Sequence, residues 1–201
     1  MKFIGITGGV GAGKSKVLSY LAEKPGVRVL LADEIAHDLM KPDTACYEMI
    51  REAFADEDIF LPEGGLRREA LAQVIFADEE KRQRMNAIVH PAVRDFVCRL
   101  AEAERARGEL WLLVLEAALL IEEHYDEICD ELWYIYTRED IRRERLAESR
   151  GYTPQKTDRI FASQLDEAAF RRHCVRVIDN NGTEEETRRQ LDGILEIIAE
   201  K

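Results

Sequence analysis

Residues 8–15 have the strongest chemical signal in the chain, because they read G-G-V-G-A-G-K-S directly after an apolar segment. The spacing fits G-x-x-x-x-G-K-[ST], in which glycines let successive backbone N–H groups turn toward phosphate oxygens. Lys14 would place a positive charge against the β- and γ-phosphates, and the Ser15 hydroxyl would be a ligand for Mg²⁺. The dinucleotide fingerprint G-x-G-x-x-G fails, since counting from Gly9 puts Lys14 at its sixth position. The motif therefore predicts a nucleoside triphosphate site.

Two acidic residues follow predicted strands at the edge where parallel α/β sheets bind their ligands. Asp33 lies just past the second strand, where a carboxylate could accept a proton from an attacking hydroxyl or orient it. The alternative role for Asp33 is an N-cap of a helix over residues 34–40. Glu116 ends the third strand and is a candidate to reach Mg²⁺ directly or through water, with an ordinary loop carboxylate as the alternative.

An arginine-rich segment follows at residues 137–150. Helical spacing puts Arg138, Arg142 and Arg145 on one face, and Arg143 and Arg150 on another. Guanidinium groups bind phosphate bidentately, so the segment suits a lid that closes over phosphates. The alternative is a solvated helix with ion pairs such as that between residues 139 and 143. On the next predicted helix, Arg159 is a candidate for a further contact, with Gln164 about one and a half turns beyond it.

Five short apolar segments predict the strands of a sheet, with helical patterns between most of them. The predicted strands are residues 3–7, 27–31, 110–115, 132–136 and 175–178. Near-continuous apolar strands that alternate with helices indicate a parallel sheet covered on both faces. The glycine-rich motif lies between the first strand and a helical pattern over residues 14–23, as a phosphate-binding loop requires.

The long interval between the second and third strands predicts helices rather than strands. The expected helices are residues 44–54, 67–76, 79–88 and 91–107, and we interpret this stretch as a helical insertion beside the sheet. A last helix over residues 183–199 would have Thr183 as its N-cap.

Composition narrows the class of protein. The 201 residues include 29 Lys+Arg and 40 Asp+Glu, a formal charge of −11, with 46% hydrophobic and 34% charged residues. Because nucleic-acid affinity comes largely from Lys and Arg, we expect no nucleic-acid partner. The longest apolar runs are too short to cross a bilayer, so we expect no membrane partner either. The four scattered cysteines lack zinc-site spacing and a secretory signal is absent, which favours reduced thiols in a cytoplasmic protein. We expect a monomer, with a weak oligomer as the alternative.

The charge is unevenly distributed along the chain. Residues 138–176 contain ten basic and seven acidic side chains, a local charge of +3, which leaves −14 for the remaining residues. The argument against nucleic acid therefore does not extend to small polyphosphate ligands, which respond to the local field.

Taken in order, the motifs resemble those of the dephospho-CoA kinase family. The family's I-G-I-T-G-G-x-G-x-G-K-S is matched by residues 4–15, and its D-A-D-x-I-A-[HR] stretch by residues 31–37. Its L-N-x-I-x-H-P, P-L-L-x-E, R-I-x-x-x-Q and [V/I]-I-D-N-x-G elements are similar to residues 85–91, 118–122, 159–164 and 177–182. The phosphate loop alone is shared by many families, whereas its combination with I-V-H-P and R-I-x-x-x-Q is specific. Two positions depart from the pattern, Leu31 in place of the first Asp and Ala118 in place of a proline.

The resemblance implies an α/β P-loop NTPase fold with a five-stranded parallel sheet flanked by helices. Residues 1–33, 108–137 and 174–201 would form the nucleotide-binding core, residues 34–107 a helical insertion that binds the CoA substrate, and residues 138–173 an arginine-bearing lid. It also implies transfer of the γ-phosphoryl group of ATP to the 3′-hydroxyl of dephospho-CoA, with Mg²⁺ as cofactor. The alternatives are another small-molecule or nucleoside monophosphate kinase and a non-catalytic nucleotide switch.

The same resemblance, added to the motifs, gives the expected site. The catalytic candidates are Asp33, Lys14, Arg142, Arg145 and Arg150. The nucleotide-binding candidates are Gly9, Val10, Gly11, Ala12, Gly13, Lys14, Ser15, Lys16, Arg159 and Asn180. The candidates for binding the acceptor substrate are Asp33, His90 and Asn86, and those for Mg²⁺ are Ser15 and Glu116.

Overall fold

The computed structural model describes residues 1–199, and the chain divides into two compact units. The first, here called the sheet unit, combines Met1–Leu30 with the chain from Glu104 onward. The second, the helical unit, is Leu31–Ala103.

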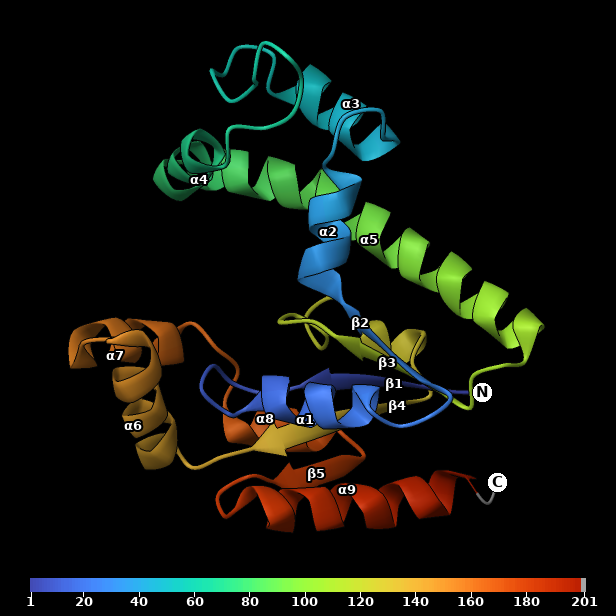
Figure 1. Cartoon of the computed structure of the whole chain (residues 1–201). Coiled ribbons are helices and arrows are strands. Elements are labelled where there is room, and N and C mark those ends of the chain that lie inside the picture. The colour runs from blue at the N-terminus through green and yellow to red at the C-terminus, as the bar shows by residue number, and fades with distance from the viewer. Residues whose placement is uncertain (200–201) are drawn as a thin grey trace. The chain divides into compact units, whose positions relative to one another are not determined.

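A five-stranded sheet lies at the centre of the sheet unit (Figure 1). Its strands are β1 (Lys2–Thr7), β2 (Val27–Leu31), β3 (Leu112–Glu116), β4 (Glu131–Tyr136) and β5 (Arg176–Asp179). The strand order is β2-β3-β1-β4-β5, and β1 pairs in parallel with both β3 and β4. Strands β1 and β3 are almost wholly buried, which explains why their sequences are continuous apolar runs rather than alternating ones. The predicted α/β fold with a five-stranded parallel sheet is confirmed.

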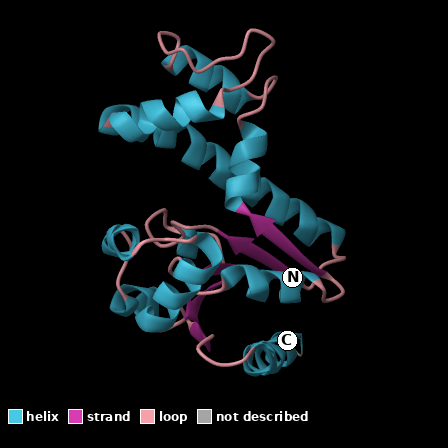
Figure 2. Ribbon diagram, turned by 60° about the vertical axis from the view of Figure 1, so that its left-hand side comes forward, coloured by secondary structure: helices cyan, strands magenta, loops and turns pink. Residues whose placement is uncertain are grey.

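Helices surround the strands of the sheet unit (Figure 2). They are α1 (Lys14–Ala22), α6 (Glu139–Arg150), α7 (Pro154–Ala162), α8 (Glu167–His173) and α9 (Glu184–Ala199), with a 3₁₀ turn at Tyr125–Glu127. Helices α1 and α9 are joined by the Tyr20 hydroxyl, which donates to Asp192 at 2.7 Å. The expected cap of α9 is confirmed, because Thr183 Oγ1 accepts from the Glu186 N–H at 3.2 Å, while the Glu186 carboxylate accepts from the Thr183 N–H at 2.8 Å.

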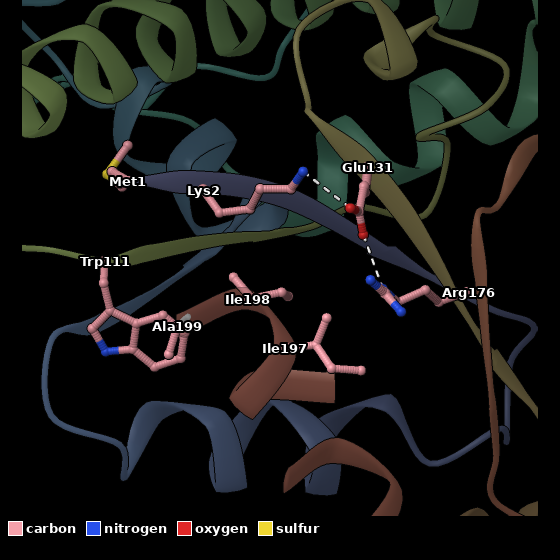
Figure 3. A pocket seen from close by; sticks show the side chains of 8 residues that line it. All are labelled: Met1, Lys2, Trp111, Glu131, Arg176, Ile197, Ile198 and Ala199. Carbon is pink, nitrogen blue, oxygen red and sulfur yellow. Dashed lines mark hydrogen bonds and ion pairs between the residues drawn. The ribbon is translucent and has the colours of Figure 1, made fainter. Parts of the chain in front are cut away.

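An ionic cluster ties together the amino ends of three strands (Figure 3). Glu131 of β4 accepts from Lys2 of β1 and from Arg176 of β5, each at 3.0 Å, and from the Trp133 indole at 3.0 Å. Burial acts to raise the pKa of Glu131, but the hydrogen bonds from Lys2, Trp133 and Arg176 outweigh it and leave the pKa lowered. With Trp111 and the end of α9, the cluster borders a cavity of about 350 Å³. This cavity lies at the amino edge of the sheet, opposite the edge where the glycine-rich turn begins.

The helical unit contains α2 (Ala32–Leu39), α3 (Ala45–Ala53), α4 (Arg68–Ala77) and most of α5 (Glu79–Arg107). Its core includes Tyr47, Ile50, Phe54 and Ile59, each at most 5% exposed. Thr44 caps α3 by accepting from the Tyr47 N–H at 3.1 Å.

One predicted break in the helical unit is wrong. The sequence analysis placed separate helices at residues 79–88 and 91–107, whereas α5 runs without interruption through Pro91. A proline inside a helix removes one hydrogen bond and costs about 3 kcal/mol. Here the apolar spacing continues across it, and Ile88, Val89, Val93 and Val97 are all buried. Burial of one continuous stripe therefore outweighs the local cost of the proline.

The four cysteines are free thiols, and three of them are buried, Cys46, Cys129 and Cys174. Within residues 1–199, no helix combines the length and the apolar character needed to cross a bilayer.

Candidate active site

The glycine-rich segment forms the turn that leads from β1 into α1. The Ala12 N–H donates to the Gly9 carbonyl at 3.1 Å, which closes the turn. Gly13 stands at the N-cap of α1 with φ 88°, a left-handed conformation that favours glycine. A Cβ atom at Gly13 would also collide with the Asn180 side-chain amide. The turn thus places backbone N–H groups and the positive end of α1 at one point, which is the arrangement that binds phosphate.

Lys14 is folded back against the turn. Its Nζ donates to the Gly8 carbonyl at 2.7 Å and lies 3.6 Å from Glu116 Oε1. The sheet register brings Glu116 here, because it pairs with Ile6 of β1, just before the turn. Burial lowers the pKa of Lys14 most strongly, Glu116 opposes that shift, and the nearby charges of Arg142 and Arg150 add to it. A further anion beside Lys14 would relieve this unfavourable environment.

Asn180 holds the backbone of the turn by a hydrogen bond. Its side-chain amide donates to the Ala12 carbonyl at 2.7 Å, and its side-chain oxygen accepts from Thr187 at 2.9 Å. Thr137 also donates to the Ala12 carbonyl at 3.0 Å, and Arg145 donates to the Asn180 carbonyl at 2.9 Å. Asn180 and Arg145 therefore brace the backbone of the phosphate-binding turn, in addition to any contact with a nucleotide.

Arg142 extends from α6 onto the turn itself. Its Nε donates to the Val10 carbonyl at 2.9 Å, and its Nη2 donates to Gln164 Oε1 at 2.8 Å. The guanidinium lies over the Phe161 ring, 4.1 Å from the ring centroid. Burial lowers the pKa of Arg142, because desolvation disfavours its charged form. The positively charged side chains of Lys14 and Arg142 therefore both contact the phosphate-binding turn. Such a pair of cations suits the transfer of a phosphoryl group.

The same chain matches known proteins over nearly its whole length. Residues 2–186 match the family model for dephospho-CoA kinase. The chain belongs to the dephospho-CoA kinase family. A dephospho-CoA kinase from Geobacter sulfurreducens is 39% identical over 196 residues, covering 96% of this chain and 97% of the relative. One from Symbiobacterium thermophilum is 38% identical over 194 residues, covering 96% and 79%. The protein is therefore an ATP-dependent phosphotransferase, and the predicted family and activity are confirmed.

A solved structure supports the fold of this dephospho-CoA kinase independently. The structure of a dephospho-CoA kinase from Campylobacter jejuni aligns with a TM-score of 0.75 at 19% identity, covering 100% of this chain and 98% of the other. At that identity the likeness speaks for the fold alone.

The other arginines of the arginine-rich segment make surface contacts. Arg138 pairs with Asp140 at 2.8 Å, and Arg143 pairs with Glu139 and Asp158, each at 2.7 Å. This is the solvated, ion-paired face that the sequence analysis offered as the alternative, while Arg142 and Arg145 of the same helix face the turn. Two further candidates, residues 150 and 159, are exposed, and Arg150 lies 5.9 Å from the Tyr152 ring. The predicted shared face is therefore split, since Arg138 pairs at the surface whereas Arg142 and Arg145 contact the turn and its support. A role of this segment as a lid stays a prediction.

Ser15 and Lys16 lie in the first turn of α1, and their side chains are exposed. The Ser15 hydroxyl makes no hydrogen bond within the described part of the chain, whereas Lys16 pairs with Glu184 at 3.3 Å. Lys16 therefore contributes its backbone to the turn and directs its side chain to α9.

Three candidates belong to the helical unit of the kinase. Asp33 lies in the first turn of α2 and is exposed, while Leu31 occupies the N-cap position. The alternative role of Asp33 as a helix N-cap is therefore wrong, because α2 begins one residue before it. Asn86 and His90 lie one turn apart on α5 and share a face of that helix.

Gln164 is the residue of this site whose importance the sequence analysis underestimated. It lies between α7 and α8, and its side-chain oxygen accepts both from Arg142 and from the Val10 N–H, the latter at 3.2 Å. The R-I-x-x-x-Q element contained the signal, but the spacing alone could not show that the glutamine, rather than Arg159, reaches the turn.

Proposed function

We propose that this member of the family transfers the γ-phosphoryl group of ATP to the 3′-hydroxyl of dephospho-CoA, giving CoA and ADP. The observation that supports this is the joint placement of Lys14 and Arg142 on the phosphate-binding turn, in a chain that matches the family over residues 2–186. Phosphoryl transfer needs positioning and charge neutralisation rather than a covalent enzyme intermediate. The two cations and the backbone N–H groups of the turn provide both.

The proposed reaction divides the work among three groups of side chains. Lys14 and the turn bind the phosphates, and Arg142, Arg145 and Arg150 offset the charge of the group in transfer. The acceptor oxygen bonds to the γ-phosphorus as the bond to the ADP oxygen breaks. Asp33 orients the acceptor hydroxyl and takes up its proton. Its exposed carboxylate in the first turn of α2 is consistent with that role.

Mg²⁺ fits the oxygen donors beside the turn. Mg²⁺ is usually bound by one or two carboxylates together with substrate phosphates, and Ser15 and Glu116 offer a hydroxyl and a carboxylate. Glu116 already lies 3.6 Å from Lys14, next to where the phosphates would be held. When bound, Mg²⁺ would neutralise charge on the β- and γ-phosphates.

The chain would divide into three working parts. Residues 1–33, 108–137 and 174–201 would bind the nucleotide, residues 34–107 would bind the CoA substrate through Asn86 and His90, and residues 138–173 would act as the lid. We further propose that the enzyme works as a monomer in the cytoplasm, without nucleic-acid or membrane partners.

Product analysis tests the proposed reaction. The purified protein is incubated with ATP and Mg²⁺ and with dephospho-CoA or a panel of nucleoside monophosphates, and ADP and the phosphorylated acceptor are quantified. We expect ADP and CoA in equal amounts with dephospho-CoA only. Robust turnover of a monophosphate alone would overturn the proposal, and ATP binding without transfer to any acceptor would favour a nucleotide switch.

A further inference from the structure

The lid and the phosphate-binding turn are joined by a closed ring of three hydrogen bonds. Gln164 Oε1 accepts from the Val10 N–H at 3.2 Å and from Arg142 Nη2 at 2.8 Å, and Arg142 Nε donates to the Val10 carbonyl at 2.9 Å. Both backbone polar groups of Val10 are therefore held by two side chains of the lid region. An Arg142 side chain without Gln164 would keep only one of its two anchors.

Neighbouring groups restrict the guanidinium of Arg142 further. The Phe161 ring lies on one side of it, 4.1 Å from centroid to guanidinium carbon. Gly9 also lies close to it, since a Cβ atom there would collide with the guanidinium. Arg142 is thus packed against an aromatic ring and a bare stretch of backbone, which leave its guanidinium little room to move. The hydrogen bonds to the Val10 carbonyl and to Gln164 together fix the orientation of the guanidinium, and without Gln164 only the first remains.

The fixed orientation leaves part of the guanidinium available. Arginine has five N–H donors in a rigid fork, and the described chain uses one on Nε and one on Nη2. The two donors on Nη1 and one on Nη2 remain beside the turn that binds phosphates. A preorganised donor costs little reorganisation when charge develops in the transition state.

We propose that Gln164 is a positioning residue for the phosphoryl transfer, acting through Arg142 by holding its guanidinium in register with the phosphate-binding turn. The inference rests on the proposed function, and it assigns to Gln164 no direct contact with substrate. Because misplacement of a catalytic group by about 1 Å can cost about 10²-fold in rate, loss of this anchor should be visible in kcat.

A double-mutant cycle tests this link. Gln164→Met removes the acceptor at similar length, Arg142→Met removes the guanidinium, and the third variant combines both. We expect Gln164→Met to lower kcat by about tenfold or more in the otherwise unaltered enzyme, and by less than about twofold in the Arg142→Met background. If the two losses in kcat are additive, Gln164 does not act through Arg142 and the proposal is overturned.

Two further variants separate positioning from general damage. Gln155→Met is the matched control, because it makes the same substitution at an exposed position on α7. The Gln155 side chain makes no hydrogen bond in the described structure, so this variant should retain the kcat of the unaltered enzyme. Arg142→Lys keeps the charge but not the fork, so it should reproduce the loss of kcat with little change in the KM for ATP. Full kcat in Arg142→Lys would contradict the proposal. Absence of any transfer to dephospho-CoA by the unaltered protein would instead refute the proposed function.

Discussion

Lys14 has an environment that penalises its own charge. Burial lowers its pKa, and Glu116 compensates only in part. Bound polyphosphate would supply further negative charge beside Lys14, so part of the binding free energy would come from offsetting the cost of burying its charge. Lys14→Met should therefore weaken ATP binding by about tenfold or more and lower kcat as well. Calorimetric titration with ATP measures the first effect, and ADP release measures the second.

Lys24→Met is the matched control for this variant. Lys24 lies just beyond the other end of α1 and pairs with Asp192 at 2.8 Å, so its removal takes away the same charge far from the turn. ATP affinity should be unchanged in this variant. Equal affinity in Lys14→Met and the unaltered protein would contradict the proposed role of Lys14 at the phosphates.

The structure removes one of the two roles that the sequence left open for Asp33, that of a helix cap. Because the N-cap position of α2 belongs to Leu31, replacing the Asp33 carboxylate removes no helix cap. Asp33→Asn should keep ATP affinity and lower kcat with dephospho-CoA by about 10²-fold or more, if the carboxylate orients the acceptor and takes up its proton. Unchanged kcat would leave Asp33 without a part in the reaction. An unfolding midpoint equal to that of the unaltered protein would confirm that the loss is chemical.

At the scale of elements, the Glu131 cluster should stabilise the amino edge of the sheet. The side chain of Glu131 is 15% exposed and accepts from Lys2, Arg176 and the Trp133 indole. A glutamine here would keep one acceptor oxygen but lose the charge and place an N–H donor against the other donors. Glu131→Gln should lower the free energy of unfolding by about 1–3 kcal/mol near neutral pH. Urea unfolding measures this difference, and Glu196→Gln, an exposed position on α9, should change it little.

The difference in the free energy of unfolding between Glu131→Gln and the unaltered protein should depend on pH. The folded-state pKa of Glu131 is lowered, so its contribution is complete above its ordinary pKa of about 4.3 and is lost as the pH falls through the lowered value. The stability gap between Glu131→Gln and the unaltered protein should therefore narrow below about pH 4. A gap that stayed constant with decreasing pH would show that packing, rather than ionic hydrogen bonding, accounts for it.

The elements show how far the sequence could predict the structure. The strands and the turn were predictable because continuous apolar runs and G-x-x-x-x-G-K-[ST] are local signals. The continuity of α5 through Pro91 was not, since it depends on which valines become buried together in the folded unit. For the same reason the spacing showed that arginines lie on α6, but not that Arg142 meets Gln164 and Val10. These contacts join residues 22 and 132 positions apart, so no local pattern contains them.

At the scale of the whole molecule, bulk charge and site charge have opposite signs. The chain has a net charge of −11, while residues 138–176 have a local charge of +3 that includes Arg142 and Arg145. The two charges predict opposite responses of ATP binding to salt. If repulsion by the whole chain dominated, screening would strengthen binding. If the cations at the turn dominate, screening weakens it.

We expect the local field to dominate, because Lys14 and Arg142 would contact the phosphates directly, whereas repulsion between charges separated by more than about 10 Å is largely screened at 0.1 M salt. The KM for ATP should therefore rise by roughly three- to tenfold between about 50 and about 500 mM KCl. The rise should be smaller in Arg142→Met, which lacks one of the cations on the turn. Potassium acetate in place of KCl should give the same trend, which excludes competition by chloride. A KM that falls with salt would show that the acidic surface governs the encounter with ATP, and that Lys14 and Arg142 act only after the nucleotide is bound.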